Sequence, residues 1–183
     1  MRHSFPCGAA PLDFVGTLQA RRNPHPTEML DTPAALDDWF VESGLIETSP
    51  GSTDDELAAA RGIREAGYEL LTARMAGHPL PERELRILNE HATGSPVQLR
   101  LTDHALQRSG TVAQALTSLA RELAELLGGP DAALLRECGR PECTQIYLDR
   151  SRGQRREWCS MKTCGNRVKA STFRARQRAQ ASV

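Results

Sequence analysis

Four of the five cysteines in this 183-residue chain lie within 27 consecutive residues. Four residues separate Cys138 from Cys143, four separate Cys159 from Cys164, and fifteen connect the two pairs. Two pairs of thiolates at such spacing converge on one tetrahedral metal, and Zn²⁺ takes four sulfurs in closed structural sites. We therefore expect one structural zinc ion, with an iron–sulfur cluster as the alternative. We interpret Cys7 as an incidental side chain near a flexible end.

The charges divide the chain into two unequal parts. Residues 1–135 carry 11 Lys/Arg against 19 Asp/Glu, a net charge of −8, whereas residues 136–183 carry 12 against 4, a net charge of +8. This asymmetry predicts an acidic body followed by a basic region that binds an anionic polymer. Arg and Lys bind phosphates without reading sequence, whereas Arg and Asn also suit base edges. The predicted DNA contacts are Arg155, Arg156, Asn166, Arg167, Lys169, Arg174, Arg176 and Arg178.

Several functional classes have little support in the sequence. No apolar run approaches the roughly 20 residues of a spanning helix, and Asp13 interrupts the apolar part of the N-terminal region, unlike a signal peptide. We expect a cytoplasmic protein with reduced thiols. No glycine-rich phosphate loop or nucleophile elbow is present, and a four-thiolate zinc leaves no position for a reactive water. The chain is therefore not expected to be an enzyme.

The predicted fold is mainly α with small β elements (α+β), divided into a helical domain over 1–132 and a zinc module over 133–183. Prolines keep residues 1–30 irregular. Helices are expected after the N-caps Thr32 and Thr53, and then over 81–91 and 111–129. Between the last two, the alternation in residues 96–102 predicts a half-buried strand, with Val97, Leu99 and Leu101 facing the core.

The zinc module is expected to follow a treble-clef-like order of knuckle, hairpin and helix. The first cysteine pair forms the knuckle, and residues 145–149 and 155–158 form the two hairpin strands. Ser160 is the expected N-cap of the final helix. At about 100° per residue, one edge of this helix should face the zinc, and Phe173 should point outward. That edge consists of Met161, Cys164, Val168, Thr172 and Ala175.

Two stretches carry a resemblance to known families. The run WCSMKTCGNRVK over 158–169, together with the Asp-Arg-Ser of 149–151, resembles the signature of the CGNR zinc-finger family. The runs LDFV over 12–15 and LDDW over 36–39 are similar to the ABATE domain that usually precedes this finger. The resemblance implies a stress-related bacterial transcription regulator with a DNA-binding finger. Gly16 and Glu157 depart from the asparagine and the basic residue that the family generally has there.

The main hypothesis is a zinc-containing DNA-binding transcription regulator. The basic helix after Cys159 would contact DNA, while the N-terminal domain would sense a small molecule, recruit a protein or form a homodimer. The opposite charges of body and tail also suggest that the tail docks on the body without DNA. The alternatives are a protein-interaction or scaffold module, and an RNA-binding protein with a structural zinc.

Overall fold

The structure is a computed structural model that describes residues 2–181. In chain order, its helices and strands are α1 (Ala10–Val15), β1 (Leu18–Gln19), β2 (Thr27–Glu28), α2 (Pro33–Glu42), α3 (Asp54–Met75), α4 (Glu82–Ala92), β3 (Gln98–Leu101), β4 (Leu106–Ser109), α5 (Val112–Gly128), η1 (Pro130–Leu134), β5 (Leu135–Glu137), β6 (Ile146–Leu148), η2 (Met161–Gly165) and α6 (Asn166–Ala181). The predicted α+β class is confirmed: helices dominate, and the strands form three antiparallel pairs, β1–β2, β3–β4 and β5–β6. In the described part of the chain, no helix is long and apolar enough to cross a membrane.

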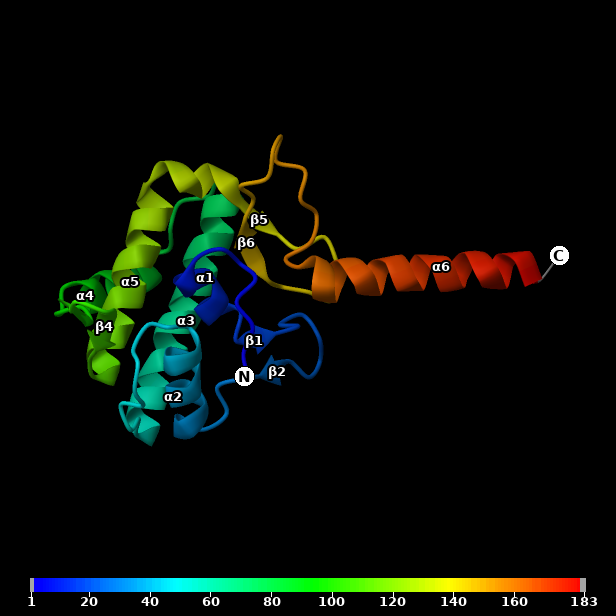
Figure 1. Cartoon of the computed structure of the whole chain (residues 1–183). Coiled ribbons are helices and arrows are strands. Elements are labelled where there is room, and N and C mark those ends of the chain that lie inside the picture. Colours follow the sequence, from blue (N-terminus) through cyan, green and yellow to red (C-terminus); the bar gives the residue numbers. More distant parts are fainter. Residues whose placement is uncertain (1, 182–183) are drawn as a thin grey trace.

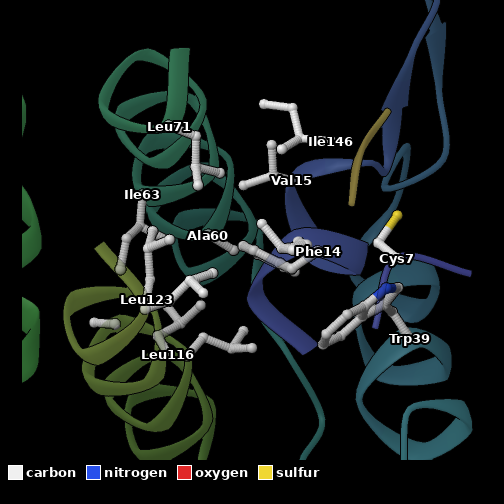
Figure 2. Packing of buried hydrophobic residues seen from close by; sticks show 14 of the residues in the cluster. Cys7, Phe14, Val15, Trp39, Ala60, Ile63, Leu71, Leu116, Leu123 and Ile146 are labelled. Atoms are coloured by element: carbon white, nitrogen blue, oxygen red, sulfur yellow. The ribbon is translucent and has the colours of Figure 1, made fainter. Parts of the chain in front are cut away.

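The helices of the N-terminal region pack around α3. Helices α4 and α5 lie against α3 and against each other, while the short α1 contacts α3, α5 and β6 (Figure 1). The apolar residues of α1 point into the space between α3 and α5, where Phe14 and Val15 meet residues such as Ile63 and Leu123 (Figure 2). The prediction left this segment as irregular chain, whereas it forms a short helix whose apolar residues dock on the core.

Helix starts follow the predicted capping chemistry. Thr32 caps α2, and its side chain accepts a hydrogen bond from the Ala35 amide at 3.2 Å. Thr53 and Thr111 each form a capping box with the residue three positions later, which satisfies two amides that a helix start leaves without an intrahelical partner. Gly77, with a φ of 69°, follows the end of α3.

The strand predicted over residues 96–102 exists, but its predicted burial is wrong. Val97, just before β3, is buried, whereas Leu99 is 64% and Leu101 is 81% exposed. Strand β3 pairs only with β4, and Leu106 opposite Leu101 is 39% exposed as well. Period-two alternation identifies a two-faced strand, but it does not say whether a core lies against the apolar face.

The N-terminal segment connects the helical region to the zinc module. The Cys7 carbonyl accepts a hydrogen bond from the Leu148 amide of β6 at 2.9 Å, and the Pro6 carbonyl accepts one from Arg156 at 2.9 Å. Cys7 is completely buried there, so the interpretation of an incidental thiol at a flexible end is wrong. The predicted domain boundary at residues 132 and 133 falls inside η1.

Helix α6 extends away from the rest of the molecule (Figure 1). Its side chains from Lys169 to Arg178 are all exposed, and Val168 near its start is half-buried. The predicted zinc-facing edge is therefore wrong at Met161, Thr172 and Ala175, which are exposed. A straight helix leaves a compact metal module after about one turn, at a rise of about 1.5 Å per residue. The zinc module of the basic region contacts the acidic body, but α6 does not dock on it as the opposite charges suggested.

Candidate metal centre and nucleic-acid interface

The first cysteine pair lies in the loop of the β5–β6 hairpin. Strand β5 pairs with β6 up to Glu137 opposite Ile146, and the Cys138 amide then donates to the Gln145 carbonyl at 3.0 Å. The Cys143 amide donates to the Arg140 carbonyl at 2.8 Å, which closes a tight turn. The loop thereby points both sulfurs toward one centre, as expected for a zinc knuckle.

The predicted second strand of this hairpin is wrong. Residues 155–158 form no strand, and the partner of β6 is instead β5. The returning segment is held by separate contacts, such as the Gly139 amide donating to the Glu157 carbonyl at 2.8 Å and the Arg156 amide donating to the Asp149 carboxylate at 3.1 Å. The hydrogen-bonding edge of β6 is therefore taken by β5, which precedes the knuckle in the chain.

The second cysteine pair brackets the wide turn η2 at the base of α6. Cys159 precedes this turn and Cys164 lies inside it, and the Gly165 amide donates to the Ser160 carbonyl at 3.0 Å. Ser160 has extended backbone but makes no side-chain capping bond, so its predicted capping role is wrong. A Cβ on Gly165 would lie 2.6 Å from the Met161 sulfur, so a larger residue there would require the flexible Met161 side chain to move.

The four sulfurs form a cluster with the dimensions of a zinc site. The Sγ atoms of Cys138, Cys143, Cys159 and Cys164 all lie within 4.8 Å of one another. The Cys143–Cys159 and Cys159–Cys164 pairs are 3.9 and 3.6 Å apart, and none of the four is in a disulfide. A tetrahedron with Zn–S bonds of about 2.3 Å has edges of about 3.8 Å, so the sulfurs fit one zinc ion. A cavity of about 140 Å³ lined by three of them provides an entry path.

The clustered sulfurs affect one another's protonation. Hydrogen bonds from the Cys143 and Cys159 thiols hold the pKa of Cys138 well below its usual range. The Cys138 thiolate in turn raises the pKa of Cys143 to about 12 and raises that of Cys159 as well. Four thiolates at these distances would repel one another, and a bound dication removes that repulsion. Backbone and Arg donors assist, since Arg140 donates to the Cys164 sulfur at 3.7 Å.

Comparison with known families agrees with this geometry. A family model for the ABATE domain, described as a "putative stress-induced transcription regulator", matches residues 8–130. The chain belongs to the ABATE family. A second model, the CGNR zinc finger, matches residues 135–177, which contain all four cysteines, and these are able to hold one zinc ion. Neither model describes an enzyme family, and a search of the curated proteins found no match.

Arg156, a predicted DNA contact, is engaged inside the protein. Its guanidinium donates to the carbonyls of Trp158 at 2.8 Å, Pro6 at 2.9 Å and Cys159, and it stacks 4.4 Å from the centre of the Tyr147 ring. These contacts join the N-terminal segment to the second cysteine pair. We therefore remove Arg156 from the DNA-contacting set and assign it a structural role. This role could not be predicted from the sequence, where Arg156 simply stands in a basic run.

The remaining predicted DNA contacts are accessible. All of them are exposed, and apart from Arg155 in the returning segment they lie on α6: Asn166, Arg167, Lys169, Arg174, Arg176 and Arg178. Sequence reasoning missed Arg140 in the knuckle, whose position between Cys138 and Cys143 was the available signal. Together with Arg167 and Arg174 it lines an open groove between the knuckle and the start of α6.

Proposed function

We propose that this zinc-containing regulator binds DNA through helix α6. The observation that carries the proposal is that α6 stands free of the body, is basic along its exposed length and is rooted in the zinc site through Cys164. The acidic net charge of the body repels phosphates, whereas the projecting helix can approach a duplex without bringing the body close. The zinc ion holds the base of the helix and performs no chemistry of its own.

A salt titration of the full-length zinc-loaded chain tests this function. We expect it to bind duplex DNA fragments with an affinity that falls linearly, in logarithms, with salt concentration, because each phosphate contact releases condensed counterions. In fluorescence anisotropy, Arg174→Gln should reduce the magnitude of the slope by about one. Arg152→Gln is the matched control, because Arg152 is an exposed arginine of the same module that lies off α6. No binding to any duplex at low salt would overturn the proposal.

The N-terminal domain is proposed to receive the regulatory signal. Its direct contacts with the finger, through Cys7 and Pro6, give a bound small molecule or protein a path to the orientation of α6. A homodimer stays a prediction, which sedimentation of the full chain with and without DNA would decide. In the same titration, a scaffold protein would show no binding to duplex DNA. An RNA-binding protein would bind single-stranded RNA more tightly than duplex DNA.

A further inference from the structure

The basic residues of α6 form two flanks. Because successive residues turn by about 100°, Arg167 and Arg174 lie on one side of the helix, and Lys169 and Arg176 lie on nearly the opposite side. All four side chains are exposed. Such an arrangement lets one helix contact phosphates on both sides at once, rather than lie flat against a single anionic surface.

The knuckle extends the first flank beyond the helix. Arg140 lines the same groove as Arg167, Ser171 and Arg174, and it is held in place by donating to the Cys164 sulfur at 3.7 Å and to Glu142 at 2.9 Å. A DNA strand that follows this groove would meet arginine donors from two different elements, with the Glu142 carboxylate beside Arg140. The phosphate-contacting surface is therefore more rigidly held at the start of α6, beside the zinc site, than at its far end.

Between the two flanks, on the side away from the zinc, α6 carries an uncharged edge. Val168 is half-buried and marks the side that turns toward the metal module. The opposite edge is exposed throughout, including Phe173 at 62%, which packs against no described aromatic ring and lies outside the buried core. Its members are Asn166, Ala170, Phe173 and Gln177.

The chemistry of this edge matches one kind of base pair. In the major groove, Asn and Gln side chains pair with the N6 and N7 atoms of adenine, and Ala and Phe contact the thymine methyl group. The major groove is about 12 Å wide and admits one α-helix, whose flanks then face the two phosphate walls. The uncharged edge carries both of these side-chain classes and lacks the Arg or Lys that pairs with guanine.

We propose that α6 lies in the major groove and reads A·T base pairs through Asn166, Ala170, Phe173 and Gln177. The flanks, with Arg140 added to the first, then supply affinity without sequence information. This inference rests on the proposed DNA-binding function. It also assigns to Arg167 and Arg174, which are chemically able to read guanine, the role of phosphate contacts.

Selection from a random duplex library by the full-length zinc-loaded chain tests the inference. The selected sites should contain a core rich in A·T pairs. Asn166→Ala combined with Gln177→Ala should reduce the preference for that core over a G·C-substituted duplex by about 30-fold or more, because two adenine-pairing amides, each worth at least about 5-fold, are lost. The substitutions place alanine on an exposed helix, which favours folding. Thr172→Ala, an exposed position on another edge of α6, should leave the preference unchanged.

Charge variants separate this inference from the function on which it rests. Arg140→Gln should reduce the salt slope by about one while the selected core stays the same, and zinc content by mass spectrometry checks that the metal site is intact. A G·C-rich core, an absence of any enriched core, or an unchanged preference in the double variant would each overturn A·T readout while DNA binding stands. Failure to bind any duplex would instead overturn the proposed function itself.

Discussion

A substitution at Gly16 should reveal how the zinc module is attached to the N-terminal domain. Gln145 of the finger reaches to the end of α1, where its side-chain amide donates to the Gly16 carbonyl at 2.7 Å and its oxygen accepts from the Cys7 thiol at 3.2 Å. A Cβ at position 16 would lie 2.1 Å from that oxygen. The change Gly16→Ala therefore forces the Gln145 side chain out of its site, although the backbone at φ −70° accepts alanine without strain.

The size and sign of the effect follow from these contacts. Losing two hydrogen bonds, one of them from a weak thiol donor, costs about 1 to 2 kcal/mol. A glycine-to-alanine change at a compatible position stabilises by about 0.4 to 1 kcal/mol through the unfolded state. Gly16→Ala should thus destabilise the protein by about 1 kcal/mol. In a Gln145→Ala background no clash remains, so the same change should be neutral or stabilising by about 0.5 kcal/mol.

Urea unfolding of the four proteins of this double-mutant cycle measures the coupling. Zinc is kept in excess, and both tryptophan fluorescence and far-UV circular dichroism follow the transition. We expect a coupling free energy of about 1.5 kcal/mol and a change of sign between the two backgrounds. If Gly16→Ala has the same effect with and without Gln145, the side chain does not occupy this site and the attachment described above is refuted.

Three further outcomes are expected. A chelator at neutral pH should unfold the finger and change the fluorescence of Trp158, because a structural zinc contributes on the order of 10 kcal/mol to folding. Arg156→Gln should accelerate chelator-induced zinc release, measured with a metal dye, and leave the salt slope of DNA binding unchanged, since its guanidinium contacts carbonyl groups inside the protein. Burial raises the pKa of Asp13 to about 6, above its unfolded value of about 3.9, so the folded state holds an extra proton between these values. Asp13 should therefore contribute about 2 kcal/mol less to stability at pH 7 than at pH 4, measured in urea titrations as the pH dependence of the difference between the protein and Asp13→Asn; the difference between the protein and Asp38→Asn, at an exposed position, should not show this dependence.

The sequence was sufficient where local chemistry determines the structure. The two cysteine pairs identified the ligands of one metal site because thiolate pairs separated by a short connector have few other structural uses. Helix starts could also be predicted, since Thr32, Thr53 and Thr111 each accept a hydrogen bond from the amide three residues ahead. The capping groups lie close together in the chain, and clustered thiolates most often have a metal ion as their partner.

The errors arose where distant segments decide the outcome. Strand β6 could pair on either side, and only the fold shows that residues 135–137 take the place predicted for 155–158. Leu99 and Leu101 have the pattern of a buried face, but no pattern reveals whether another element covers them. Gly16 departs from the family pattern, and its role became clear only when Gln145 was seen in the space that a side chain would fill.

The zinc site explains how so basic a helix keeps its shape and direction. An isolated helix of about 12 to 15 residues is marginal in water, and the like charges of α6 weaken it further. Starting a helix is the costly step, because several residues must be ordered before one hydrogen bond forms. In this chain the metal fixes Cys159 and Cys164, and the turn η2, which contains Cys164, leads directly into α6 at Asn166. Attachment through Gln145 and Arg156 then fixes that starting point relative to the N-terminal domain. Loss of these contacts would therefore leave the direction of α6 relative to the N-terminal domain unfixed, even with the zinc site intact.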